Sequence, residues 1–347
     1  MKKIFWTIAL IALAACALFA GSWLQVNRLP VLRGQAEIFV RPGTSPEQVI
    51  GAISDCTAIK WPKMLERTMC RHEVATYCKP GHYVIEADKP AIYICRMLNN
   101  GWQTPVHVVL SGTLRRKPDI ARKISRQLML DSAEVHQALN SDALLSKYGF
   151  TSENVFALMV PDTYEMYWTA SMEDFFDIQK KAYDAFWTEE NKAKAAAQGL
   201  TPMEVSILAS IVKGESNHIP EFPKIAGVYL NRLHDGMRLQ ADPTIAYLMD
   251  YDVIRIYNWM MKIESPYNTY LHEGLPPAPI YVPTKETLNA VLNPDYGGGN
   301  MFFCADSAFN GTHKFAKTYD EHVRNAKAYR AALNARLAAR KAAEAKK

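Results

Sequence analysis

The sequence predicts an α+β protein with an N-terminal transmembrane helix, a small α+β module, and then a mixed α/β domain. Three observations lead to this prediction. An uncharged apolar run begins the chain, short β-branched runs alternate with helical patterns over 36–112, and helices alternate with Pro- and Gly-rich loops from Thr201 onward. With 347 residues, the chain is long enough for two or three modules that each bury a core.

The N-terminal run has the length of a membrane span. Lys2 and Lys3 precede an apolar stretch, 4–24, that as a helix would rise about 31 Å and cross a hydrocarbon core of about 30 Å. A cleaved signal peptide usually has a shorter apolar region of about 7–15 residues, so we expect residues 1–25 to be a transmembrane anchor. Little positive charge follows the run, which predicts a cytoplasmic N-terminus and an extracytoplasmic body.

The alternative to this anchor is a lipoprotein, because Leu13-Ala14-Ala15-Cys16 resembles a lipoprotein processing site. The apolar run continues past Cys16, which favours the transmembrane helix. Either way we expect an exported protein that is held at a membrane.

Disulfides are possible in such a compartment. Four of the six cysteines are clustered, and these are Cys56, Cys70, Cys78 and Cys95. Four cysteines allow three pairings, and their spacing does not choose among them. The alternative is that some are buried as small apolar residues.

Positive charge lies at the two ends of the chain. The net charge is +5, with +3 on residues 1–30 and +6 on residues 321–347, which leaves −4 on residues 31–320. A nucleic-acid-binding protein is expected to carry its positive charge on the folded body. We therefore expect no nucleic-acid partner.

The module at 36–112 is predicted from short strand and helix patterns. Ile38 and Val40 alternate with polar residues, and a turn then leads to a helix that begins near Pro46. The other elements of the module are predicted at 81–85 and 106–110 (strands) and at 90–98 (helix).

Residues 113–200 are predicted to be a helical connecting region, with Gly199 at its end. Thr201-Pro202-Met203-Glu204 is typical of a helix start, with Thr201 as the cap and Glu204 three residues later. This helix opens the domain at 201–330. Residues 331–347 are expected to form a basic, solvated helical tail.

The helix from Pro202 ends in a carboxylate on its apolar face. Leu208, Ile211, Val212 and Glu215 have the spacing of one helix face. Loss of hydration raises the pKa of a carboxyl group, and a carboxyl group that is protonated near neutral pH can act as a general acid toward a glycosidic oxygen. The alternative is that Glu215 pairs with a nearby cation and only stabilises the fold.

The residues around Glu215, 207–216, resemble the catalytic helix of the endolytic murein transglycosylase family (MltG/YceG-like proteins). Further motifs of the family follow in the same order. They are Ile225–Leu233, Gly236–Thr244, Ser265–Tyr270, Glu273–Pro277, Phe303–Asp306 and His313–Phe315, and Pro161–Tyr164 precedes them. The resemblance covers residues 36–330. It implies that Glu215 is the catalytic residue, that 36–112 is a LysM-like glycan-binding module, and that 201–330 is the catalytic domain.

The sequence departs from the family pattern beside the predicted catalytic residue. Lys213 stands where an acidic residue is common, Gly214 where a lysine is common, and Ala278 where a glycine is usual. The first two departures bear on the local charge around Glu215.

The resemblance implies an endolytic lytic transglycosylase of the bacterial inner membrane. Such an enzyme cleaves the MurNAc-GlcNAc bond of nascent peptidoglycan strands and leaves 1,6-anhydro-MurNAc ends, which terminates or trims strand elongation. It needs one carboxyl group, whereas a hydrolase needs two. We expect no metal or cofactor, and we expect peptidoglycan strands, the membrane and peptidoglycan synthesis complexes as partners.

Polar and aromatic residues of the same motifs are the predicted substrate-binding residues. They are Gln240, Asp242, Thr244, Tyr247, Ser265, Asn268, Thr269, Tyr270, Glu273 and His313. Three of them have structural alternatives: Asp242 as a helix cap, Glu273 as a residue that holds its loop, and His313 as a structural hydrogen-bonding residue.

Two other functions compete with this prediction. Glu215 and His218 have the spacing of carboxylate-bridged metal sites, but such sites need a second Glu-x-x-His motif, which the sequence lacks. The second alternative is a membrane-anchored, non-catalytic peptidoglycan-binding scaffold.

Overall fold

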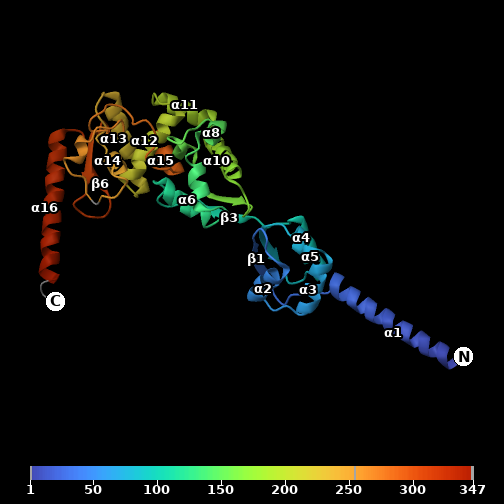
Figure 1. Ribbon diagram of the computed structural model, residues 1–347. Helices are drawn as coiled ribbons and strands as arrows, with labels where there is room; N and C mark the ends of the chain where they lie inside the picture. The colour runs from blue at the N-terminus through green and yellow to red at the C-terminus, as the bar shows by residue number, and fades with distance from the viewer. Residues whose placement is uncertain (1, 254, 345–347) are drawn as a thin grey trace. The chain divides into compact units, whose positions relative to one another are not determined.

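The computed structural model describes residues 2–253 and 255–344, and it confirms the predicted α+β class (Figure 1). The chain divides into two compact units. The N-terminal unit contains residues up to 108 together with 124–131 and 164–171, and the C-terminal unit contains 109–123, 132–163 and the chain from 172 on. The predicted connecting region, 113–200, therefore contributes to both units.

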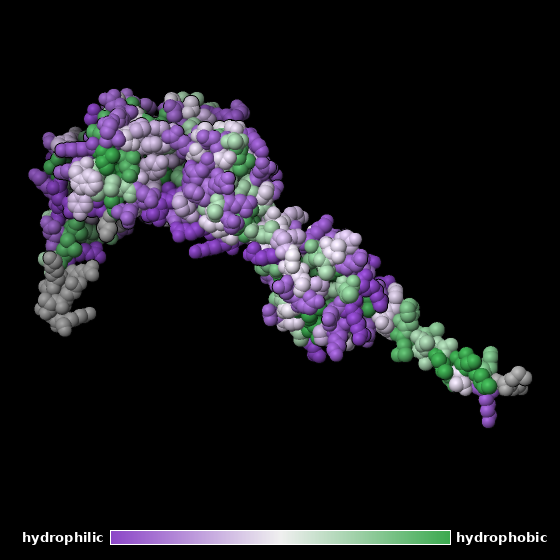
Figure 2. All heavy atoms as spheres, viewed as in Figure 1, coloured by the Kyte–Doolittle hydropathy of each residue, from purple (hydrophilic) through white to green (hydrophobic). Residues whose placement is uncertain are grey.

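Helix α1 (Lys2–Asn27) is long and apolar enough to cross a membrane by itself. Its hydrophobic side chains are exposed along its length, as Figure 2 shows. An N-terminal helix with these properties is typical of a membrane anchor or a signal sequence.

The rest of the N-terminal unit is a small α+β module. Strand β1 (Ala36–Val40) pairs antiparallel with β2 (Gly81–Ile85), as the alternating pattern predicted. The helices of the module are α2 (Pro46–Cys56), α3 (Pro62–Arg71), α4 (Val74–Tyr77) and α5 (Ala91–Asn100). The core beneath the strands is aliphatic and aromatic, and its members include Ile38, Ile53, Leu65, Tyr83 and Leu98. A second two-stranded sheet joins β3 (Val106–Val109) to β4 (Thr163–Met166).

All six cysteines carry free thiols, so the structure does not support disulfides among the four clustered cysteines. Cys95 is fully buried in the core of the module and Cys78 is packed against that core, which is the small apolar role left open above. The Cys56 thiol donates to the carbonyl of Glu37 at 3.2 Å.

Short helices lead from the module to the C-terminal core. They are α6 (Lys117–Ser125), α7 (Ser132–Ala138), α8 (Asp142–Leu145), α9 (Val155–Leu158), α10 (Met172–Phe186) and α11 (Glu189–Ala197). A 3-10 turn, Ser146–Tyr148, follows α8.

The C-terminal core is built on three helices that pack on one another, α12 (Pro202–Glu215), α13 (Phe222–His234) and α15 (Lys285–Leu292). Thr201 and Glu204 form the predicted capping box at the start of α12. The packing is close, because a Cβ atom on Gly227 of α13 would lie 2.2 Å from the carbonyl oxygen of Asp295.

The C-terminal unit also contains short elements and one long helix. They are the 3-10 turns Ile219–Glu221 and Met260–Lys262, helix α14 (Asp242–Leu248), the antiparallel pair β5 (Phe302–Ala305) and β6 (His313–Ala316), and helix α16 (Tyr319–Glu344). Helix α16 begins at Tyr319, before the predicted tail at 331–347, and it packs on β5 and β6. The last three residues of the predicted tail lie outside the described residues.

Candidate active site

Glu215 is the last residue of α12, and the predicted apolar stripe leads to it. Leu208, Ile211 and Val212 are fully buried, whereas Glu215 is partly exposed. Gly214 brings this end of the helix close to the start of α14, because a Cβ atom there would lie 2.6 Å from Cβ of Pro243. The glycine therefore lets the first residues of α14 lie beside Glu215.

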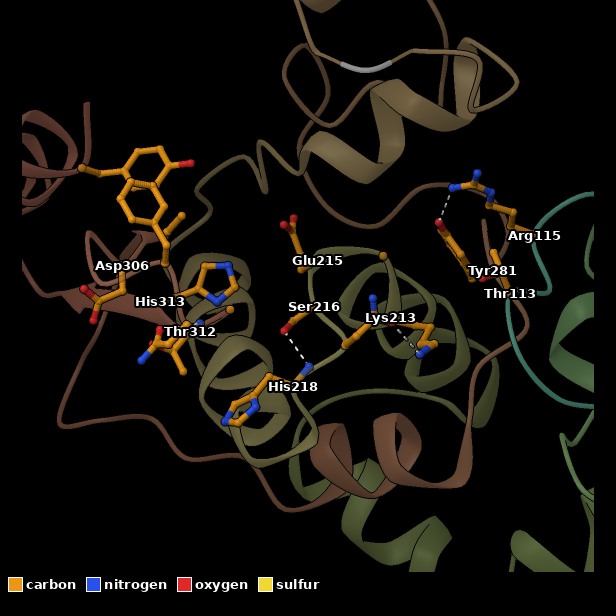
Figure 3. A pocket seen from close by; sticks show the side chains of 17 residues that line it. Thr113, Arg115, Lys213, Glu215, Ser216, His218, Tyr281, Asp306, Thr312 and His313 are labelled. Carbon is orange, nitrogen blue, oxygen red and sulfur yellow. Dashed lines mark hydrogen bonds between the residues drawn. The ribbon is translucent and has the colours of Figure 1, made fainter. Parts of the chain in front are cut away.

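Glu215 lines two pockets. The large pocket, of about 730 Å³, is also lined by Arg115, Lys213, His218 and His313 (Figure 3). The small pocket, of about 310 Å³, lies against α13, α14 and α16. Its other lining residues are Tyr229, Arg232, Gln240, Asp242, Tyr270, Phe302, Phe303, Tyr319 and His322. A ligand that occupies both pockets would therefore pass the Glu215 carboxyl group.

Helix α13 supplies the nearest partners of this carboxyl group. The Tyr229 hydroxyl, which is almost fully buried, donates a hydrogen bond to Oε1 of Glu215. One turn further along, the buried guanidinium of Arg232 donates to the backbone carbonyls of Met301, at 2.7 Å, and Leu239. These two bonds fix a positive charge behind Glu215.

The pKa of Glu215 reflects these surroundings. Burial raises it from 4.5 to about 7, and the negative charge of Asp242 acts in the same direction. The Tyr229 hydrogen bond and the Arg232 charge act in the opposite direction because they stabilise the carboxylate. A carboxyl group with a pKa near 7 can both donate and accept a proton at neutral pH.

Asp242 does not cap α14. The cap position is Ala241, and Asp242 is the first residue of the helix. Its carboxylate accepts a hydrogen bond from the Tyr270 hydroxyl, and both residues line the small pocket. The alternative role of Asp242 as a helix cap is therefore wrong.

Gln240 also lines the small pocket, and it has a left-handed backbone with φ of 49°. Such a conformation is uncommon outside glycine and is often found at functional sites. The backbone N–H of Gln240 donates to the carbonyl of Thr269 at 2.9 Å, which helps to hold the residue there.

Three other predicted binding residues are buried and fix this loop. Thr269 Oγ1 accepts from the backbone of Ala241 at 3.0 Å and shares a hydrogen bond with Thr244 Oγ1 at 2.9 Å. Asn268 donates to the carbonyls of Met261 and Ile263. These side chains line neither pocket, whereas the sequence predicted that they contact the substrate directly.

Tyr247, Ser265 and Glu273 also line neither pocket. The Tyr247 ring lies 4.8 Å from the ring of Tyr267, and Ser265 Oγ accepts from the backbone N–H of Tyr267 at 3.2 Å. Glu273 is exposed on its loop.

His313 lines the large pocket and is held by Glu221. Its backbone N–H and its Nδ1 each lie 2.8 Å from a carboxylate oxygen of Glu221. The imidazole therefore has a structural partner and also borders the pocket, as Figure 3 shows.

Sequence reasoning missed Tyr229 and Arg232, although a signal was present. Both are polar groups one turn apart on a largely apolar helix, and such groups need partners when buried. It also missed Tyr319 and His322 of α16, because these residues belong to none of the motifs and no pattern distinguishes them. Among the described residues, no group of three His, Cys, Asp or Glu side chains is arranged to hold a metal ion.

The fold and the site define a protein in which a partly exposed carboxyl group with a raised pKa lies between two polar pockets. The model of the YceG-like family matches residues 38–328, and the chain belongs to this family.

Proteins named endolytic murein transglycosylase are similar to about half of the chain. The protein from Bacillus subtilis (strain 168) is 32% identical over 164 residues, which are 47% of this chain and 44% of that protein. The protein from Streptococcus pneumoniae (strain ATCC BAA-255 / R6) is 28% identical over 175 residues, which are 48% of this chain and 31% of that protein. The chain thus matches less than half the length of these curated relatives.

A solved structure shares the fold. The crystal structure of a yceG-like protein from Listeria monocytogenes has a TM-score of 0.56 and 23% sequence identity to this chain, and the match covers 84% of this chain and 99% of that one.

Proposed function

We propose that the protein is a lytic transglycosylase that cleaves the MurNAc-GlcNAc bond of peptidoglycan strands and leaves 1,6-anhydro-MurNAc ends. The observation that carries this proposal is the Glu215 carboxyl group, with its pKa raised to about 7, at the boundary of two polar pockets. The similarity to proteins named endolytic murein transglycosylase supports it.

The first step needs Glu215 in its protonated form. Its proton passes to the glycosidic oxygen while the bond from this oxygen to C1 of MurNAc breaks, and GlcNAc leaves with a free hydroxyl group. General acid catalysis of this kind contributes about 10²–10⁴-fold to the rate. The Tyr229 hydrogen bond and the Arg232 charge stabilise the carboxylate that results.

The second step uses the same group as a base. The Glu215 carboxylate takes the proton of the MurNAc 6-hydroxyl group while the oxygen of this hydroxyl group bonds to C1. This closes the anhydro ring, restores the protonated Glu215 and consumes no water. One carboxyl group is sufficient for both steps. Gln240, Tyr270 and His313 line the two pockets and would contact the sugars there.

The presence of Asp242 in the small pocket favours a second candidate, a hydrolase. Asp242 acts on the pKa of Glu215, and hydrolases use two carboxyl groups. Its hydrogen bond with Tyr270 instead supports a role in positioning this tyrosine. The two candidates differ in their products, because a hydrolase leaves a reducing end.

The N-terminal parts of the chain would bring this site to its substrate. We propose that residues 1–25 anchor the protein in the inner membrane with its body extracytoplasmic, that 36–112 is a LysM-like glycan-binding module, and that 201–330 is the catalytic domain. The exposed ring of Phe39 supports glycan binding by the module. It is held in place by two buried rings, His82 at 4.7 Å and Trp168 at 5.1 Å between ring centres, and offers an apolar face to a sugar ring.

Because the anchor would keep the protein at the membrane, the proposed substrate is nascent strands that are still close to the membrane. The cut would terminate the elongation of these strands or trim them. Peptidoglycan synthesis complexes would then be the protein's neighbours.

Mass spectrometry of the muropeptides released from purified peptidoglycan tests this function. The full chain in detergent is compared with its Glu215→Gln variant. We expect anhydro-muramyl ends from the unmodified protein and none from the variant. Reducing ends from the unmodified protein would support the hydrolase, and glycan binding without cleavage would support the scaffold.

A further inference from the structure

The large pocket is rich in basic side chains on one side of Glu215. Arg115, Lys213 and His218 come from different parts of the C-terminal unit and line this pocket together (Figure 3). Its other carboxylate, Asp306, is paired with Lys314 at 3.2 Å. Among the side chains that the structure describes, no carboxylate forms an ion pair with Arg115 or Lys213. The pocket therefore presents two uncompensated positive charges beside the reacting group.

Arg115 is held in place by neutral partners. Its Nη1 donates to the Tyr281 hydroxyl at 3.0 Å, and its guanidinium carbon lies 4.4 Å from the centre of the Tyr251 ring. Neither contact neutralises the charge. A guanidinium fixed in this way is ready to bind a carboxylate, because little side-chain freedom is then lost on binding.

Lys213, in the last turn of α12, adds a second cation to the lining of this pocket. Its Nζ lies 3.3 Å from the amide oxygen of Asn217, which is again a neutral partner. The two side chains make the large pocket complementary to an anion, whereas the small pocket contains the carboxylate of Asp242.

We infer that the large pocket binds a carboxylate of the substrate, and that this carboxylate belongs to the peptide on the muramic acid that is cut. This inference rests on the proposed function and names the substrate class of the same site. Each muramic acid carries a lactyl group, and in intact strands this group is joined to a peptide with free carboxylates. A strand without peptides has a lactyl carboxylate instead, so the carboxylate has two sources that the test must separate.

The test compares three preparations of one strand population: strands with native peptides, the same strands after their peptide carboxylates are converted to amides, and strands freed of peptide by an amidase. We expect the native strands to be cleaved with a kcat/KM about tenfold above that of the amidated strands, the order of one charge-assisted hydrogen bond at a partly exposed site. We also expect the peptide-free strands to be cleaved less well than the native ones. Equal rates on native and amidated strands would overturn the inference, and faster cleavage of peptide-free strands would assign the pocket to the lactyl carboxylate instead.

Charge variants locate the effect. In Arg115→Gln and Lys213→Gln we expect the ratio of the rates on native and amidated strands to fall toward one. This ratio does not depend on the fraction of folded protein. A change in the reactivity of Glu215 alters both rates equally and therefore leaves the ratio unchanged. Lys224→Gln removes an exposed charge on α13 that lines neither pocket, and this control should keep the ratio of the unmodified protein. A ratio unchanged in both pocket variants would contradict the assignment.

A binding measurement separates this inference from the proposed function. With Glu215→Gln, which is not expected to cut, a GlcNAc-MurNAc-tripeptide should bind about tenfold more tightly than its amidated counterpart. Equal binding of the two would refute the inference, whereas anhydro ends from either strand type would still support the transglycosylase. Release of reducing ends, together with the expected preference for native over amidated strands, would refute the transglycosylase function but still support carboxylate binding by the large pocket.

Discussion

Removal of the Tyr229 hydroxyl tests how the site sets the pKa of Glu215. In the structure this hydroxyl donates to Oε1 of Glu215, and the bond lowers a pKa that burial has raised to about 7. A hydrogen bond to a charged group contributes about 1.5–3 kcal/mol and one to a neutral group about 0.5–1.5 kcal/mol. The carboxylate therefore loses about 1–1.5 kcal/mol more than the protonated form in Tyr229→Phe, which raises the pKa of Glu215 by about one unit.

The pH profile of kcat/KM measures this shift. The first step needs protonated Glu215, so the rate falls as the pH rises through the pKa of Glu215 in the free enzyme. We expect this alkaline limb near pH 7 in the unmodified protein and about one unit higher in Tyr229→Phe. Tyr296→Phe loses a hydroxyl that donates to Gln198 and lines neither pocket, so it should leave the limb in place. An unchanged or lowered limb in Tyr229→Phe would refute the reasoning.

Three further predictions follow from the same structure. Because the pKa of Glu215 is raised in the folded state, the protein should lose up to about 3 kcal/mol of unfolding free energy as the pH rises from 4.5 to 7. Glu215→Gln should remove this loss in thermal denaturation measured across that pH range. The same pH dependence of stability in the two proteins would contradict the prediction. Gly227→Ala should lower the unfolding free energy by about 1–3 kcal/mol because its Cβ meets the Asp295 carbonyl, whereas Gly51→Ala, in open space on α2, should raise it by about 0.5–1 kcal/mol in denaturant titrations. Phe39→Ala should weaken glycan binding in a pull-down with insoluble peptidoglycan by about fivefold, the order of one lost aromatic contact. Because Phe39 also packs on His82 and Trp168, the two proteins are compared below the unfolding transition of each, and unaltered binding would argue against a glycan contact at Phe39.

The sequence predicted the parts of the fold that depend on local patterns. The capping box of Thr201 and Glu204 identifies the start of α12, and the apolar spacing that leads to Glu215 identifies its buried face. The alternation of Ile38 and Val40 likewise predicted β1. In each case the signal lies within a few residues of the element that it predicts.

The parts that could not be predicted depend on contacts between distant segments. Tyr229 is on α13 and Glu215 on α12. A buried hydroxyl on an apolar helix indicates that a partner exists, but nothing local identifies Glu215 as that partner. The sequence predicted a solvated tail only over 331–347, whereas α16 begins at Tyr319, and its Tyr319 and His322 lie against the Phe302 ring of β5. Thr244 and Thr269 are buried but were expected to face the substrate, because polarity alone does not distinguish a positioning residue from a contacting one.

The central claim is that Glu215 alone supplies and recovers the proton, and that the MurNAc 6-hydroxyl, not water, attacks C1. Digestion of purified peptidoglycan by the full chain in oxygen-18 water, followed by mass spectrometry of the new glycan ends, tests this most directly. We predict anhydro ends that contain none of the heavy isotope, with no new ends from Glu215→Gln. Reducing ends that carry one heavy oxygen at C1 would contradict the claim and identify a hydrolase.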